Sequence, residues 1–113
     1  MFIETKTIVV KEGFSQQIVD HFTGPGIIEH SPGFIDLSVL VKRVRRGDEE
    51  IIVLIRWESE AAWKGWETSE AHIEGHRQNR GKPKPDYVIS SAHATYDVKS
   101  SKGPAVKTEA VEH

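Results

Sequence analysis

The sequence predicts one α+β domain of the ferredoxin-like type. Segments with the alternation of strands and segments with the spacing of amphipathic helices follow one another as strand, helix, strand, strand, paired helices and strand. The chain has 113 residues, which is the size of a single domain with a modest core. Its hydrophobic content of 37% and charged content of 28% are those of an ordinary soluble globular protein.

A first strand is expected over residues 2–10, where every second residue shares one face of the sheet. Two polar residues, Glu4 and Lys6, fall on the same face as three apolar ones. That face therefore either reaches solvent at one end or lines a partly polar cavity. The three apolar residues are Phe2, Ile8 and Val10.

A first helix is expected after a break at Gly13. Apolar residues there recur at helical spacing and leave the opposite side polar, so we expect the helix to pack one face on a sheet. Gly24 and Pro25 end it, and a short connection through Ile27 and Ile28 follows. The recurring apolar residues are Phe14, Ile18, Val19 and Phe22.

A hairpin is expected at the centre of the sheet, with strands over residues 34–46 and 49–57 and a turn at Gly47 and Asp48. Residues 51–55 are all apolar, which is typical of a strand covered on both faces. The helices of one chain can cover only one of these faces. We therefore expect a second copy, in a homodimer, to cover the other.

Two short helices are expected after the hairpin. Ser59 precedes an acidic first turn, as a helix N-cap does, and Thr68 or Ser69 repeats the signal ten residues later. These signals place the helix starts just after residues 59 and 69.

Indole and imidazole side chains gather on these two helices. Trp63 and Trp66 lie three residues apart, and His72 and His76 lie four apart, so each pair shares a helix face. The two pairs can therefore line one space. Residue types alone favour a structural role, because tryptophan at helical spacing is more often core and a histidine on an apolar face is more often a hydrogen-bonded core residue.

A last strand over residues 86–98 completes an ordered domain over residues 1–99, and the polar segment 100–113 is expected to be a tail that is mobile or wraps around a partner. The net charge of −2 gives no field that would gather nucleic acid. No apolar run is long enough to span a membrane, and no secretory signal is visible. Together with the absence of cysteine, this predicts a cytoplasmic protein.

The stretch from Trp57 to Asp86 resembles the helix pair of the IsdG-type heme-degrading monooxygenases, a branch of the antibiotic biosynthesis monooxygenase superfamily. The resemblance rests on Trp66, on His76 ten residues later, on a preceding strand that ends in Trp57 and on the offset of the N-terminal strand. It covers about residues 1–99. It implies a dimeric αβ barrel, in which the sheets of two copies join.

The resemblance also implies roles for three residues. His76 would be the axial ligand of the heme iron, and Trp66 would press the porphyrin out of plane. The family's distal asparagine corresponds here to Lys6, whose ammonium can donate a hydrogen bond to bound oxygen but cannot accept one. His72 is the competing imidazole, one turn earlier. The basic side chains that follow would meet heme propionates or solvent, namely Arg77, Arg80, Lys82 and Lys84. The remaining histidines are expected to have no role in the site, namely His21, His30, His93 and His113.

Three functions are compatible with these residues. The first, implied by the resemblance, is oxygen-dependent opening of heme, with electrons from a reductase or ascorbate and with release of iron and a linear tetrapyrrole. Heme would then be both substrate and cofactor. The second is a cofactor-free monooxygenase of a polyketide or quinol, which would not need His76. The third is a non-catalytic dimer that binds heme or another small molecule, with Lys6 blocking turnover.

Overall fold

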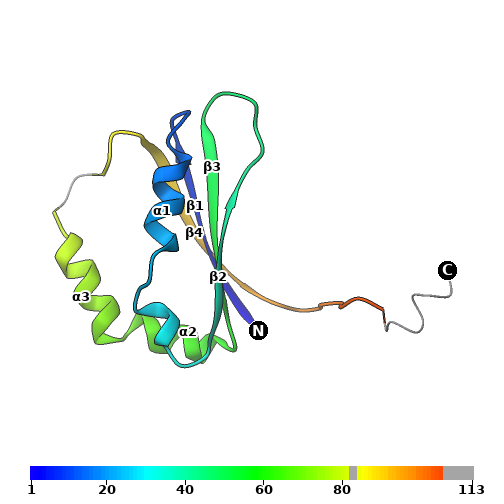
Figure 1. Ribbon diagram of the computed structural model, residues 1–113. Coiled ribbons are helices and arrows are strands. Elements are labelled where there is room, and N and C mark those ends of the chain that lie inside the picture. The colour runs from blue at the N-terminus through cyan, green and yellow to red at the C-terminus, as the bar shows by residue number, and fades with distance from the viewer. Residues whose placement is uncertain (82–83, 106–113) are drawn as a thin grey trace.

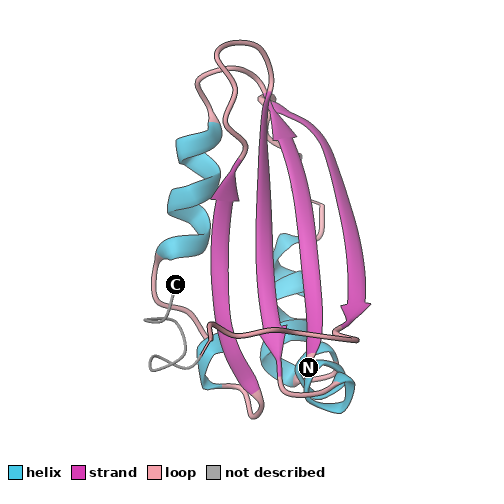
Figure 2. Cartoon of the chain, turned by 90° about the vertical axis from the view of Figure 1, so that its right-hand side faces the viewer, coloured by secondary structure: helices cyan, strands magenta, loops and turns pink. Residues whose placement is uncertain are grey.

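The computed structural model describes residues 1–81 and 84–105 and confirms the ferredoxin-like fold class. Within these residues, four strands form one antiparallel sheet in the order β2-β3-β1-β4. Figures 1 and 2 show the helices on one face of this sheet and none on the other. The elements are β1 (Phe2–Val10), α1 (Ser15–Thr23), the 3-10 helix η1 (Ile28–His30), β2 (Phe34–Val41), β3 (Glu49–Trp57), α2 (Glu60–Glu67), α3 (Glu70–Asn79) and β4 (Val88–Asp97).

The core under the helices consists of two clusters at opposite ends of the sheet. At one end, α2 covers Trp57, and the ring of Trp63 lies 5.0 Å from that of Phe2. At the other end, α1 packs Ile18 on Val10 and Ile51. Each of these side chains, when fully buried, contributes about 1.5–3 kcal/mol relative to an exposed position. The two clusters thus hold α2 and α1 on the sheet, and Phe22 of α1 packs against both.

The N-caps of α2 and α3 confirm the predicted helix starts. Ser59 Oγ accepts a hydrogen bond from the Ala62 N–H at 3.1 Å. Between the two candidates for the second cap, the structure selects Ser69, whose Oγ accepts from the His72 N–H at 3.2 Å. Thr68 is excluded because its hydroxyl donates back to the Lys64 carbonyl at 2.9 Å. Consequently α3 begins directly after α2 has ended.

Helix α1 has no side-chain cap of its own and is capped from β3 instead. Glu49 Oε1 accepts a hydrogen bond from the Ser15 N–H at 2.9 Å. The backbone N–H of Gly13, followed by that of Ser15, lowers the pKa of the Glu49 carboxyl. A carboxylate at a helix N-terminus is stabilising, so this contact fastens α1 to the hairpin.

Two predicted strands differ in their bounds from the observed ones. Strand β2 ends at Val41 and not at residue 46, because the segment that follows carries Arg43, Arg45 and Arg46, all exposed to solvent in the hairpin loop. Strand β4 spans Val88–Asp97, which is shorter at both ends than the predicted residues 86–98. The short connection after α1 contains the helix η1. Residues 98–105 form no helix or strand, and the prediction for the rest of the tail lies outside the described residues.

The second face of the sheet is partly apolar, and none of the helices in residues 1–81 and 84–105 lies on it (Figures 1 and 2). Ile52 and Leu54 of the central strand are half-buried there, and Leu40 and Tyr96 are 46% and 54% exposed. The five-residue apolar run in β3 therefore has helical cover on one side only. Among the helices of the described residues, none has the length and apolar character needed to cross a membrane.

Candidate functional site

A pocket of about 430 Å³ opens between the helix face of the sheet, α3 and the connection after α1. Its volume is in the range of small-molecule sites, which is about 300–1,000 Å³. The pocket contains four ionisable side chains, whereas a hollow of about 530 Å³ beside α1 and β2 has two. Apolar walls come from Phe22, Ile27, Ile28, Leu37, Ile55 and Trp66, and the ionisable side chains are Glu4, Lys6, His72 and His76.

The two tryptophans of α2 have different positions. Trp63 faces the core and packs on Phe2, whereas Trp66 lines the pocket as well as contacting the core. The Trp66 indole lies 4.9 Å from the His72 ring, edge to face. The expectation that indole and imidazole line one space is therefore confirmed for Trp66, while Trp63 is a core residue.

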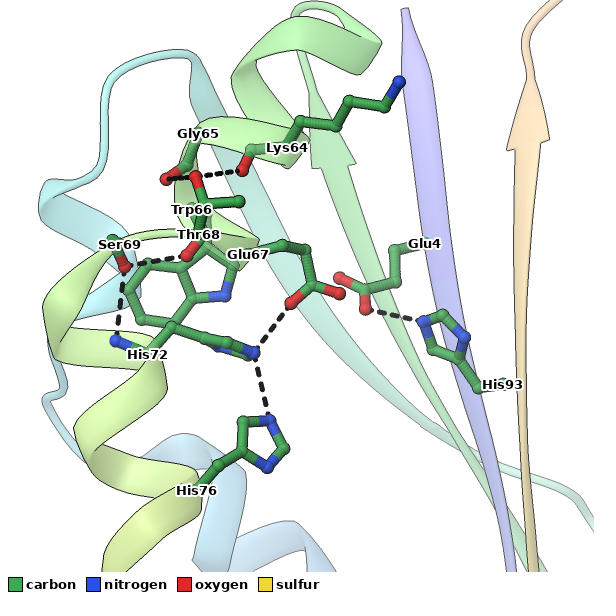
Figure 3. Close-up of polar contacts among 10 residues, drawn as sticks. All are labelled: Glu4, Lys64, Gly65, Trp66, Glu67, Thr68, Ser69, His72, His76 and His93. Carbon is green, nitrogen blue, oxygen red and sulfur yellow. Dashed lines mark hydrogen bonds and ion pairs between the residues drawn. The ribbon is translucent and has the colours of Figure 1, made fainter.

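The two histidines of α3 both line the pocket but have different partners (Figure 3). His72 Nε2 lies 2.7 Å from Glu67 Oε2 and 3.0 Å from His76 Nε2. Burial lowers the pKa of His72, and the Glu67 carboxylate acts in the opposite direction. His76 is exposed, and the His72 imidazole is the one hydrogen-bond partner of its side chain within the described residues. His76 is therefore the imidazole that is freer to accept a ligand.

Lys6 lines the pocket from β1, as its position on the predicted polar patch required. Its Nζ lies 6.0 Å from the centre of the Phe22 ring. Glu4, two residues earlier on the same strand face, does not pair with Lys6, because its carboxylate contacts His93, whose Nε2 lies 2.8 Å from Glu4 Oε2. The Lys6 ammonium thus remains directed at the pocket.

His93 was expected to have no role in the site, and it does not line the pocket, but its imidazole contacts Glu4, which does. His93 lies on the helix side of β4, opposite Lys6 in the strand register, and its imidazole reaches Glu4, which is only 4% exposed. The half-buried Glu67 completes this group of side chains. Sequence reasoning missed the group because its members come from three separate elements, although a glutamate on an apolar strand face was a signal.

Of the basic side chains that were expected near heme propionates, Arg77, Arg80 and Lys84 do not line the pocket. Arg77 pairs with Glu74 at 3.0 Å on the outer side of the helix, and Arg80 and Lys84 are exposed. Lys82 lies outside the described residues. Of the other histidines, His21 is exposed on α1, His30 lies in η1, and His113 lies outside the described residues.

Comparisons with known proteins agree with this fold. The family model of the antibiotic biosynthesis monooxygenases matches residues 1–78. The heme-degrading monooxygenase HmoA of Bacillus subtilis is 54% identical over 102 residues, which cover 90% of this chain and 94% of the relative. A crystal structure from Bacillus cereus, assigned to the antibiotic biosynthesis monooxygenases, has 63% identity and a TM-score of 0.83 over 94% of this chain and 98% of that one.

A more distant structure shares the fold alone. It is that of MhuD, a heme degrader from Mycobacterium tuberculosis, with two hemes bound in its active site. The identity is 21% and the TM-score 0.65, over 91% of this chain and 100% of that one.

Proposed function

The chain belongs to the antibiotic biosynthesis monooxygenase family, and within that family we propose that it is a heme-degrading monooxygenase. The observation that carries the proposal is that Trp66 and His76 line the same pocket. The 54% identity with a heme-degrading monooxygenase over most of both chains supports the same reaction.

The residues of the pocket fit heme. Its walls are mainly apolar, which suits the flat macrocycle, and one exposed imidazole is available as the single protein ligand that an iron porphyrin needs. When bound there, heme supplies the iron that activates dioxygen, electrons come from a reductase or ascorbate, and ring opening releases iron and a linear tetrapyrrole.

His76 is the proposed axial ligand. To present its Nε2 to the pocket it has to release the 3.0 Å contact with His72. His72 stays in place because Glu67 holds its Nε2 at 2.7 Å. The carboxylate thereby keeps the second imidazole away from the iron and leaves His76 as the ligand.

Trp66 and Lys6 are proposed to act on the bound heme from two sides. Trp66 stands at the pocket wall on α2, where a bulky indole can bend the macrocycle. Lys6 reaches the pocket from β1 and can donate hydrogen bonds but accept none. It can therefore stabilise negative charge that develops on oxygen, in the place where the family's asparagine would act.

The domain over residues 1–99 is proposed to work as a cytoplasmic homodimer. The bare sheet face carries half-buried Ile52 and Leu54 in its centre, and exposed apolar side chains flank them. A second copy that packs its own sheet on this face would form the dimeric αβ barrel and complete the cover of β3.

The proposal is tested by hemin titration of wild type, His76→Ala and His21→Ala. His21 is an exposed histidine outside this pocket, so it controls for nonspecific binding by imidazole. Wild type and His21→Ala should show a Soret band that decays with ascorbate in air with catalase present. His76→Ala should keep its circular dichroism spectrum and lose the ligated Soret band.

Other outcomes select other functions. An unchanged Soret band and affinity in His76→Ala would remove this residue as the ligand. A wild type without any Soret change would favour a cofactor-free monooxygenase. A stable Soret band under ascorbate would favour a heme-binding dimer without turnover.

A further inference from the structure

Three side chains from three elements meet beside the heme pocket (Figure 3). Glu4 comes from β1, Glu67 from the end of α2 and His93 from β4. Each offers one ligand atom, and these atoms all lie within 4.8 Å of one another. In Figure 3 the two carboxylates point toward each other, with His93 behind Glu4.

The two carboxylates of this group have imidazoles as partners, and not a lysine or arginine, among the described residues. Glu4 is 4% exposed, and burying a carboxylate is costly unless a partner of positive charge compensates it. Among the described residues, no lysine or arginine forms an ion pair with Glu4 or Glu67, and each carboxylate contacts one imidazole. The nearby Lys6 lies over the Phe22 ring instead. Two carboxylates that approach this closely favour a cation between them.

The donor set is that of a transition-metal site. Two carboxylate oxygens and one imidazole nitrogen are ligands for divalent manganese, iron, cobalt and zinc. Metal–ligand bonds of about 2.0–2.2 Å bring neighbouring ligand atoms to roughly 3 Å from one another. The Glu4–His93 contact of 2.8 Å already has this spacing. Glu67 is half-buried, and its ligand oxygen lies within 4.8 Å of the ligand atoms of Glu4 and His93.

The surroundings support the ligands and leave a way in. His72 contacts the Glu67 carboxylate at 2.7 Å, in the manner of the outer-shell hydrogen bonds that orient metal ligands. The side chain of His93 is 47% exposed, so an ion can enter from solvent beside β4. We propose that Glu4, Glu67 and His93 bind one divalent first-row transition-metal ion at a site distinct from the axial position of His76.

The site shares one wall residue with the heme pocket, because Glu4 lines both. An Fe²⁺ ion set free in the pocket could therefore transfer to this site through a single carboxylate. This role for the site rests on the proposed heme degradation, whereas metal binding itself does not.

The test uses the heme-free full chain and Mn²⁺, which suits a carboxylate-rich site. The electron paramagnetic resonance signal of free Mn²⁺ falls as the ion binds, so a titration gives stoichiometry and affinity. Wild type should bind one Mn²⁺ per chain. Glu67→Gln and His93→Gln should each weaken binding at least about tenfold, as loss of a ligand does.

Two controls separate this site from its neighbours. Glu74→Gln removes an exposed carboxylate that pairs with Arg77 and should leave the Mn²⁺ affinity unchanged. His76→Ala removes the imidazole pair of α3, which could itself chelate a metal, and should also leave the affinity unchanged. Circular dichroism checks that each variant is folded, and both ligand variants change partly exposed side chains.

Two results would overturn the metal site. One is that no Mn²⁺ binds at these residues, seen either as no binding by wild type or as an affinity that Glu67→Gln and His93→Gln leave intact. The other is binding that only His76→Ala removes, which would assign the ion to the imidazole pair. Since no heme is present, a failure of this site leaves the heme titration untouched, and a failed heme titration leaves this site untouched.

Discussion

Gly33 is the position where a single methyl group should do most damage to the site. It lies between η1 and β2 with φ of +83°, and its carbonyl accepts a hydrogen bond from the Glu58 N–H at 2.8 Å. A Cβ at this position would lie 2.4 Å from the Cβ of Ala62. Ala62 belongs to α2, so Gly33→Ala has to push away the helix that carries Trp66.

The cost of Gly33→Ala has two parts. The left-handed backbone costs roughly 1–2 kcal/mol for a residue with a Cβ. The overlap with α2 adds about 1–3 kcal/mol, which is typical of overpacking. The free energy of unfolding should therefore fall by about 2–5 kcal/mol, out of the roughly 5–15 kcal/mol expected of a domain.

Gly47→Ala is the matched control. Gly47 has φ of +92°, but a Cβ there would meet nothing within 4 Å. This variant should lose only the backbone part, about 1–2 kcal/mol. Urea denaturation of the two variants and wild type, followed by circular dichroism, isolates the contact with α2 as the difference.

The same variants connect the fold to the site. Because α2 has to move in Gly33→Ala, we expect weaker hemin binding in the fraction that remains folded, and no such loss in Gly47→Ala. Equal losses of unfolding free energy in the two variants would refute the reasoning, since the close approach to Ala62 would then carry no cost.

Three further predictions concern the pocket, the cap of α1 and the open sheet face. Trp66→Phe should lower the rate of heme decay with little change in hemin affinity. Trp63→Phe, which changes a core residue, should lower the thermal midpoint more than the rate. If Trp66→Phe instead lowers mainly the thermal midpoint, Trp66 acts in the core alone. The backbone N–H groups at the start of α1 lower the pKa of Glu49. The ionised carboxylate therefore stabilises the folded chain at pH values above the ordinary glutamate pKa, and this stabilisation disappears as the pH falls through the lowered pKa. Glu49→Gln should therefore reduce the thermal midpoint at about pH 7, and this reduction should shrink as the pH falls below the ordinary glutamate pKa. Glu50→Gln is a neighbouring control that should lack this pH-dependent effect. Sedimentation at micromolar concentration should give twice the mass of one chain for wild type. Leu54→Lys, which puts a charge in the centre of the open face, should give the mass of one chain. A wild type that stays a folded monomer would count against the dimer.

Local signals in the sequence were sufficient for most of the fold. Alternation gave the bounds of β1, and the serine caps gave the starts of α2 and α3, because these features depend on neighbouring residues alone. The end of β2 was missed because Val44 continues the apolar pattern while the arginines around it favour solvent. Where a strand stops depends on pairing with its neighbour, which a single sequence does not show.

The residues of the pocket were predictable where a local signal places them, as it does for Lys6 on the first strand. Trp66 and His76 come from adjacent helices, and both line the pocket. The contact between Glu4 and His93 joins residues 89 positions apart, on strands that become neighbours only in the folded sheet. Since no local pattern encodes that adjacency, His93 could not be placed from sequence.

The pocket itself follows from the way one strand face is divided. The apolar ends of β1 belong to separate clusters, with Phe2 covered by α2 and Val10 covered by α1. Between them, Glu4 and Lys6 interrupt the apolar pattern and line the pocket, to which α1 and α2 contribute only Phe22 and Trp66. A polar stretch cannot anchor a helix by apolar burial, so the two helices pack at the ends and part in the middle. The residue pattern that predicts the strand thus also predicts where the cavity opens. Glu4 and Lys6 offer no apolar surface on which a helix can pack, and the same two residues line the site.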